Sequence, residues 1–120
     1  MGLDNIIYER RGVKDKDLSE VLAPLTGGML VDGNNSFRGK VYAGWFENIT
    51  SYSLYESDDF SDQDYKNIID ELKSYKTSFK YIDDLDEDLE NSNMNAEELD
   101  AFIKLFQLCE ERSWGINAWY

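Results

Sequence analysis

The sequence predicts a single α+β domain that is mainly helical, with a small β-element near the N-terminus. A chain of 120 residues is long enough for one hydrophobic core and too short for two independent ones. Its hydrophobic content of 42% and aromatic content of 14% supply a packed interior. Apolar residues recur at helical spacing along much of the chain, whereas the expected strands are short and lie near the start. We therefore expect residues 1–120 to form one domain.

The N-terminal third of the chain is expected to carry the β-element and one short helix. Residues 5–11 predict a strand, because three consecutive β-formers occupy its centre. Residues 17–25 predict a short helix, since a capping aspartate is followed by leucine and valine residues at helical spacing. Residues 29–31 predict a second short strand, which ends at the turn-forming residues 32–35.

Two helices are expected in the middle of the chain. Residues 39–50 have an ambiguous period, because their Val, Tyr, Trp, Phe and Ile side chains also favour strands. Helix is the preferred interpretation for this segment, and strand is left open. The next helix is better defined, since Ser61 is a typical cap and apolar residues follow at three- and four-residue spacing as far as Phe79.

The last part of the chain is expected to contain an acidic loop, a helix and a packed tail. Residues 83–95 predict a loop within the domain, with at most a turn of helix. Asn95 is the expected cap of the final helix, Glu98 stands at its capping-box position, and the apolar face extends to Cys109. The aromatic tail at residues 114–120 is expected to pack back on the core, because exposed it would form a sticky patch.

The charge of the chain is strongly negative and unevenly distributed. The sequence holds 25 Asp and Glu residues against 12 Lys and Arg, a formal net charge of −13 at pH 7. Residues 1–50 hold seven acids and six bases, a net charge of −1, whereas residues 51–120 hold eighteen acids and six bases, a net charge of −12. Such a chain repels nucleic acid and anionic membranes and attracts cationic protein surfaces. We expect a basic protein as the partner.

The sequence contains no histidine, which excludes several classes of catalytic and metal site. It lacks the commonest general base, any Ser–His or Cys–His nucleophile pair and the usual ligands of zinc. Paired carboxylates could still act as acid and base, but among 25 acids some pair falls at a suggestive spacing by chance. We expect a protein that is not an enzyme and that uses neither a cofactor nor a metal.

The single cysteine, Cys109, lies in an apolar stretch. One thiol excludes an internal disulfide, and the apolar setting predicts a small buried side chain rather than a reactive group. A chain without disulfides suits a reducing compartment, so we expect a cytoplasmic location. No run of about 18 apolar residues occurs, and the sequence therefore predicts no transmembrane helix.

The turn between Gly33 and Val41 is similar to a phosphate-binding loop but departs from its pattern twice. Gly33 lies one residue too early, and Val41 stands where a magnesium-binding Ser or Thr is needed. A polar turn with Arg38 and Lys40 at the start of a helix can still hold an anion through backbone N–H groups and the helix dipole. In the other interpretation these two bases pair with the acidic part of the same chain.

Two acidic runs supply the candidate partner-binding residues. The first lies at residues 56–59, and the second, at residues 83–90, has six acids in eight positions. They allow three interpretations: solubility alone, docking on a basic protein, or metal binding. In its sharpest form docking is DNA mimicry, in which carboxylates take the place of phosphates in a nucleic-acid-binding cleft. The candidate partner-binding residues are Asp58, Asp59, Asp83, Asp84, Asp86, Glu87, Asp88 and Glu90.

The stretch that begins at Asp86 also resembles a calcium-binding loop of twelve residues. Asp86, Asp88 and Glu90 stand at alternate positions, and Glu97 takes the twelfth place. Glycine is missing at the sixth place and Asn93 takes the apolar eighth place, so the turn residue and the packing anchor are both absent. A solvated acidic segment is therefore the preferred interpretation.

Four segments resemble small uncharacterised proteins encoded by bacteriophages. They are the start Met1–Asn5, the run Gly27–Met29, the segment Ser36–Tyr42 and the stretch Ile49–Tyr55. The likeness covers about residues 1–55, and the acidic part beyond them has no counterpart. It implies a setting in the infected bacterial cytoplasm and no particular mechanism. Small acidic phage proteins often bind and block host or defence proteins, so the resemblance favours docking.

The preferred hypothesis is a non-catalytic acidic binding module, encoded by a phage, that acts as a monomer or a dimer. It blocks the basic, nucleic-acid-binding surface of a host or defence protein. The alternative is a small phosphate- or nucleotide-ligand binder or enzyme that uses the Gly33–Lys40 turn, with Arg38 and Lys40 carrying the positive charge. A third possibility, a virion structural subunit, requires a self-complementary surface.

Overall fold

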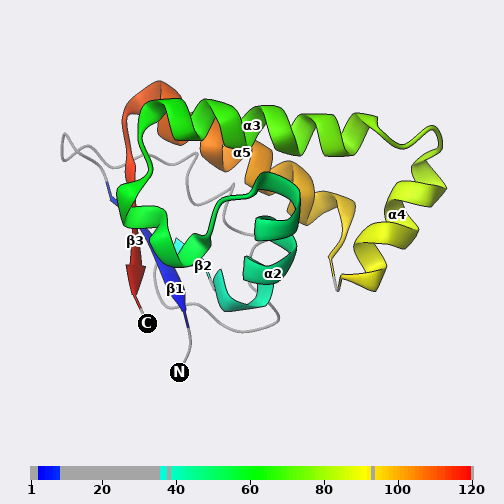
Figure 1. The fold of residues 1–120 in the computed structure, drawn as a ribbon, viewed down its shortest axis with the longest axis horizontal. Coiled ribbons are helices and arrows are strands. Elements are labelled where there is room, and N and C mark those ends of the chain that lie inside the picture. The colour runs from blue at the N-terminus through cyan, green and yellow to red at the C-terminus, as the bar shows by residue number, and fades with distance from the viewer. Residues whose placement is uncertain (1–2, 9–35, 38, 93, 120) are drawn as a thin grey trace.

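The fold combines a small sheet with a layer of helices (Figure 1). The structure, a computed structural model, describes residues 3–8, 36–37, 39–92 and 94–119. The elements, in chain order, are β1 (Asp4–Tyr8), β2 (Ser36–Phe37), α2 (Gly39–Thr50), the 3₁₀ helix η1 (Leu54–Asp59), α3 (Asp62–Thr77), α4 (Ile82–Asn91), α5 (Ala96–Arg112) and β3 (Gly115–Trp119). This confirms the predicted α+β class. The expected helix at residues 17–25 and strand at residues 29–31 lie outside the described residues.

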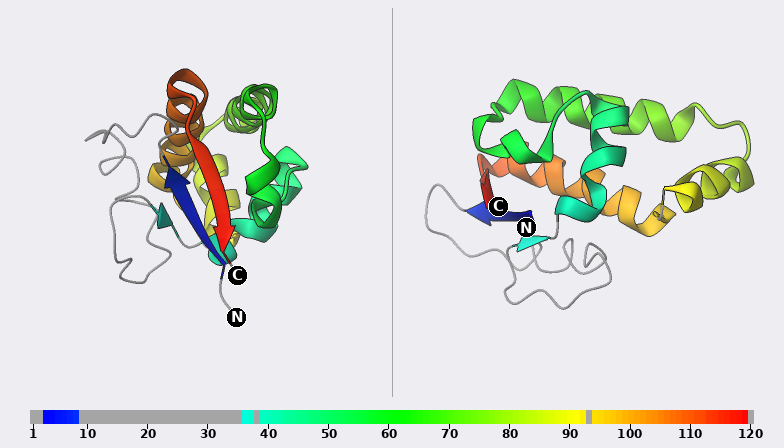
Figure 2. Two further views of the ribbon diagram at one scale, coloured as in Figure 1. Left: turned by 90° about the vertical axis from the view of Figure 1, so that its left-hand side faces the viewer. Right: turned by 60° about the horizontal axis from the view of Figure 1, so that its bottom comes forward.

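The sheet has three antiparallel strands in the order β2–β1–β3. In the central strand β1, Ile7 lies opposite Ile116 of β3, and both side chains are buried. Asn5 lies opposite Phe37 of β2 and is buried as well. Figure 2 shows the long strands β1 and β3 side by side, with the helices behind them, and the start of β1 at Asp4 pairs with the end of β3 at Trp119. The sheet therefore covers one end of the helical layer.

The predicted β-element near the N-terminus is confirmed, but the sheet also includes a strand from the C-terminal part of the chain. The strand expected at residues 5–11 is observed as β1 as far as Tyr8. The C-terminal tail, for which the sequence predicts only packing on the core, buries Trp114 and then continues as β3. Gly115 allows this pairing, because a Cβ atom there would lie 2.1 Å from the Tyr8 ring.

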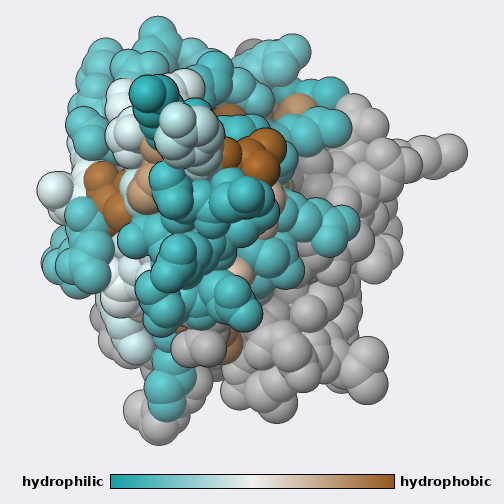
Figure 3. Space-filling model, turned by 90° about the vertical axis from the view of Figure 1, so that its right-hand side faces the viewer, coloured by the Kyte–Doolittle hydropathy of each residue, from teal (hydrophilic) through white to brown (hydrophobic). Residues whose placement is uncertain are grey.

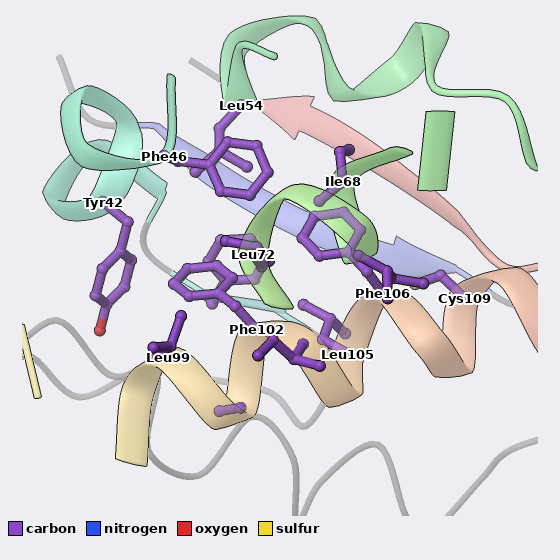
Figure 4. Close-up of a cluster of buried hydrophobic side chains, with 14 of the residues drawn as sticks. Tyr42, Phe46, Leu54, Ile68, Leu72, Leu99, Phe102, Leu105, Phe106 and Cys109 are labelled. Atoms are coloured by element: carbon purple, nitrogen blue, oxygen red, sulfur yellow. The ribbon is translucent and has the colours of Figure 1, made fainter. Parts of the chain in front are cut away.

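The core between the sheet and helices α2, α3 and α5 is rich in aromatic rings (Figure 4). Phe102 of α5 is fully buried, and its ring centroid lies 5.0 Å from that of Tyr42 and 5.9 Å from that of Phe46. Phe106, one turn further along α5, stacks on Phe46 with centroids 5.5 Å apart. Cys109 is buried on the same helix, as predicted.

The ambiguous segment at residues 39–50 is a helix, α2. Its large side chains Tyr42, Trp45 and Phe46 stand three and four residues apart, so a helix directs all three to one buried face. A strand would send adjacent residues to opposite faces and expose one aromatic ring. The preferred helical interpretation is therefore confirmed.

Helices α3 and α5 lie antiparallel and side by side (Figure 1). Lys66 of α3 lies 3.6 Å from Glu110 of α5, and ten residues further along α3, Lys76 lies 2.6 Å from Asp100. These ion pairs are exposed and contribute little to stability. The buried apolar faces of the two helices hold them together, and the ion pairs mark their register.

Both helices begin at the predicted caps. The Ser61 hydroxyl accepts a hydrogen bond from the Asp64 N–H at 3.2 Å, and the Asp64 carboxylate accepts one from the Ser61 N–H at 2.8 Å, which completes a capping box. The Asn95 side chain accepts a hydrogen bond from the Glu98 N–H at 2.8 Å. The Glu98 carboxylate accepts one from the Tyr42 hydroxyl at 2.5 Å, which ties α5 to α2.

Removing the Ser61 cap should weaken the domain measurably. Ser61→Ala leaves the Asp64 N–H without its acceptor, and we expect the free energy of unfolding to fall by about 1 kcal/mol in urea denaturation. Ser74→Ala, at an exposed position inside the same helix, is the matched control and should be neutral or slightly stabilising. An equal loss in both variants would contradict a specific capping role.

The acidic segment at residues 83–95 differs from the prediction. The sequence predicts a loop with at most a turn of helix, whereas most of the segment belongs to the ten-residue helix α4. The prediction is wrong because Leu85 and Leu89, four residues apart, share one helix face and are both buried against the domain. Their burial offsets the repulsion between the neighbouring acids.

Candidate protein-docking surface

Helix α4 stands at one end of the long axis of the molecule, opposite the sheet (Figure 1). The molecule measures 42 × 30 × 25 Å, and α4 links the C-terminal end of α3 to the start of α5. Leu85 and Leu89 attach one face of α4 to the domain, and the Met94 N–H donates to the Leu89 carbonyl at 2.8 Å. The helix therefore projects from the domain while one of its faces is fixed.

A second attachment of α4 is the hydrogen bond that the Tyr75 hydroxyl of α3 donates to the Asp88 carboxylate. The partly buried Tyr75 ring packs edge-on against Trp45, with centroids 5.9 Å apart, and against Phe79 at 5.3 Å. Burial, together with the hydrogen bond to Asp88, raises the pKa of Tyr75 to about 12. Asp88 thus helps to position α4 in addition to carrying charge.

Tyr75 should lose its proton late in an alkaline titration. Its pKa in the folded protein is about 12, against an ordinary value of 10.0. Because the folded pKa is the higher one, the fold favours the neutral phenol of Tyr75. This contribution to stability is fully present below about pH 10 and is lost as the pH rises toward about 12. Ultraviolet titration of Tyr75→Phe should lack one phenolate that forms near pH 12. In Asp88→Ala the same step should move to lower pH, and a step that stays in place would contradict the role of Asp88.

The exposed faces of α4 carry a dense negative charge. Ten residues that rise about 1.5 Å each span about 15 Å. Six carboxylates over that length give about one charge per 2.5 Å, against about one per 1.7 Å of double-stranded DNA. In the described part of the chain, both ion pairs join α3 to α5 and neither involves α4. The fold thus brings together six of the predicted residues: Asp83, Asp84, Asp86, Glu87, Asp88 and Glu90.

The acids of α4 have opposing effects on the stability of the helix itself. Asp83 and Asp84 in the first turn interact favourably with the helix dipole, whereas the negative charge of Glu90 in the last turn interacts unfavourably with it. Like charges also stand four residues apart, as in the pairs Asp83–Glu87 and Asp86–Glu90, and each such pair costs roughly 0.2–0.5 kcal/mol. Solubility does not require charges to gather where they repel one another. A positive surface brought against α4 would relieve this repulsion.

The other two predicted partner-binding residues, Asp58 and Asp59, are separated from α4. Both lie on η1, which packs on β3 at the sheet end of the molecule. The Asp58 carboxylate accepts a hydrogen bond from the Ala118 N–H at 2.8 Å and so supports the edge strand β3. These two acids do not belong to the same contact surface as α4.

The alternative anion site at the start of α2 is described only in part, because Arg38 lies outside the described residues. The Lys40 side chain is exposed, but its backbone N–H donates to the Leu3 carbonyl at 3.3 Å. Gly39 lies so close to Asn5 that a Cβ atom there would be 1.7 Å from the Asn5 Oδ1. The first turn of α2 is thus packed on the N-terminal strand, and one N–H that an anion would use is already engaged.

A cleft of about 350 Å³ lies between the end of α2, η1 and the start of α3. The Tyr52 hydroxyl donates to the Asp64 carboxylate at 3.2 Å and accepts from Asn67 at 3.0 Å. The hydrogen bond from the Ser61 backbone N–H holds the pKa of Asp64 below its usual value, so this carboxylate is charged at neutral pH. An acidic cleft repels phosphates and nucleotides. Its lining residues are Glu47, Ser51, Tyr52, Ser53, Glu56, Asp59, Phe60 and Asp64.

The calcium-like spacing that begins at Asp86 does not form a loop, because residues 86–91 are helical and cannot wrap around one ion. Among the residues that the structure describes, no three acidic or cysteine side chains converge as metal ligands do. Within the same residues, no helix is both long and apolar enough to cross a membrane.

Comparisons with known proteins assign no function to α4 or to any other part of the chain. The sequence matches no protein-family model, no curated protein and no solved structure. The geometry and charge of α4 are therefore the features that single out this helix as the candidate site.

Proposed function

We propose that this protein is a non-catalytic binding module whose helix α4 occupies the basic, nucleic-acid-binding surface of another protein. The observation that carries the proposal is the concentration of six carboxylates on ten helical residues at the end of the domain. Their linear charge density approaches that of DNA. A nucleic-acid-binding cleft is the kind of surface that offers lysine and arginine at a matching density.

Such binding resembles the binding of DNA, except that the carboxylates of this protein take the place of the DNA phosphates. The partner's lysines and arginines gain carboxylates as counterions, and the affinity falls as salt screens the contact. The net charge of −13 steers a basic partner toward the protein and raises the association rate. Because Leu85, Leu89 and Asp88 already hold α4 in place, little conformational entropy is lost when it docks.

The proposed partner is a host or defence protein of an infected bacterium, and nucleases and restriction enzymes are the leading candidates. The resemblance of residues 1–55 to bacteriophage proteins supports this setting in the bacterial cytoplasm. An inhibitor that occupies a nucleic-acid-binding cleft needs no chemistry of its own, which agrees with a chain that has no histidine. The protein acts as a monomer or a dimer.

Pull-down from a bacterial lysate at low and at high salt tests this proposal. The tagged protein should capture a specific nucleic-acid-binding protein at low salt and release it at high salt, because the contact is electrostatic. This captured partner is then purified for the measurements described in the Discussion. Recovery of no specific basic or nucleic-acid-binding protein at low salt would count against the proposal.

A further inference from the structure

Two exposed apolar side chains adjoin the acidic surface of α4. Ile82, the first residue of the helix, is 75% exposed, and Tyr81 just before it is 60% exposed. The next most exposed large apolar side chain among the described residues is Val41, at 45%. Figure 3 shows the α4 end of the molecule, where hydrophilic residues cover most of the described surface and apolar patches appear between them.

Ile82 continues the apolar stripe that attaches α4 to the domain. It stands three residues before Leu85 and seven before Leu89, positions that share one helix face. Leu85 and Leu89 are buried, whereas Ile82 lies beyond the part of the stripe that the domain covers. An apolar side chain at this position is therefore available for burial against a partner.

The side chain of Tyr81 takes no part in capping the helix. Its backbone caps α4, but its side chain makes no capping hydrogen bond. The Lys80 ammonium lies 5.5 Å from the centroid of the Tyr81 ring, within the range of a cation–π contact. The ring therefore already accepts a cation on one face, and tyrosine is among the residues enriched at the centre of protein interfaces.

We propose that Tyr81 and Ile82 form an apolar anchor that inserts into an apolar pocket on the basic surface of the partner. This inference rests on the proposed function of α4 and specifies its partner further. The partner is a protein surface on which lysine and arginine surround an apolar pocket. Lys80 brings one positive charge to the Tyr81 side of the anchor, but Asp83 and Asp84 follow Ile82 directly in the chain and Asp86 lies one turn away. The net charge around the anchor is therefore negative and selects a basic occupant.

The same charge argues against other occupants of this surface. A second copy would bring two acidic helices together, each on a chain with a net charge of −13, and like charges that face each other across an interface are costly. Nucleic acid and anionic membrane are repelled for the same reason. A basic protein is the occupant that meets both the apolar and the acidic parts of the surface.

The anchor and the carboxylates should affect binding in different ways. Carboxylates accelerate association and make the affinity depend on salt. A buried apolar side chain adds affinity that salt screening does not remove, and truncating Ile82 should weaken binding about tenfold or more. Ile82→Ser should therefore lower the affinity at every salt concentration. A plot of the logarithm of the binding constant against the logarithm of the salt concentration should keep the same slope.

Nuclear magnetic resonance titration with two peptides of equal positive charge tests the anchor. One peptide contains lysine alone, and the other carries the same lysines with leucines at helical spacing. We expect the lysine–leucine peptide to bind α4 about tenfold more tightly and to shift the Ile82 methyl signals. Ile82→Ser should remove this difference, whereas Val41→Ser, which truncates an exposed apolar side chain on α2, should preserve it.

The possible outcomes separate the anchor from the proposed function. If both peptides bind α4 equally well and Ile82→Ser changes neither affinity, the anchor is overturned and the docking function stands. If neither peptide binds α4, both proposals fail. If the Ile82 methyl signals shift with protein concentration when no peptide is present, a second copy is the occupant and the anchor for a basic partner is overturned.

Discussion

Replacing five carboxylates of α4 by amides should remove most of the binding to the captured partner while the fold stays intact. Exposed charges contribute little to stability, and removing neighbouring like charges relieves repulsion. The association rate constant should fall by about ten- to a thousandfold at low ionic strength, measured by surface plasmon resonance. Asp88 is kept, because it accepts the hydrogen bond from Tyr75. The changes are Asp83→Asn, Asp84→Asn, Asp86→Asn, Glu87→Gln and Glu90→Gln.

A matched control removes the same number of exposed charges from other parts of the surface. Because both variants have the same net charge, a difference between them reports the position of the carboxylates. Equal losses of binding would mean that net charge alone matters. An unfolded α4 variant, or undiminished binding at low salt, would mean that the acids of α4 are structural or only solubilising. The control changes are Glu47→Gln, Glu56→Gln, Asp70→Asn, Glu71→Gln and Glu111→Gln.

Phe102→Ala should have the largest effect on the stability of the domain. The Phe102 ring is fully buried and lies within 6 Å, centroid to centroid, of rings from four other residues, Phe37, Tyr42, Trp45 and Phe46. Its truncation removes this contact area and leaves a cavity, which costs about 3–5 kcal/mol. For a domain of this length that is a large part of the total stability. We expect the melting temperature to fall by roughly 10–20 °C in thermal unfolding followed by circular dichroism.

An exposed apolar residue provides the comparison for this core variant. Val41→Ala, on the outer face of α2, should change the free energy of unfolding by less than about 0.5 kcal/mol. A loss in Phe102→Ala as small as that in Val41→Ala would show that Phe102 is not at the centre of the core. The packing of α2 on α5 described above would then be wrong.

Helix boundaries were predictable from sequence wherever a local signal determines them. The caps Ser61 and Asn95 act within one turn of the residues they cap, so α3 and α5 begin where the sequence places them. Strand β3 was not predictable in the same way. It depends on Ile116 pairing with Ile7 at the opposite end of the chain, and on Gly115 leaving room for the Tyr8 ring.

The sequence predicted which acidic residues form the candidate site, but it did not predict that they lie on a helix. The run of acids at residues 83–90 is plain in the sequence, but it indicated a loop, because repulsion between acids opposes a helix. Burial of Leu85 and Leu89 against the rest of the domain decides the outcome, and burial of that kind depends on the tertiary fold. The distance of Asp58 and Asp59 from α4 depends on the fold in the same way.

Displacement of DNA from the captured partner tests the central claim most directly. The partner is loaded with fluorescently labelled duplex DNA, and this protein is added while fluorescence anisotropy is recorded at low salt. We expect the anisotropy to fall to the value of free DNA, because α4 and the duplex compete for one basic surface. The variant with five amides in α4 should release DNA only at much higher concentration. An anisotropy that stays high while the protein binds the DNA-loaded partner would contradict the claim that α4 occupies the nucleic-acid-binding surface.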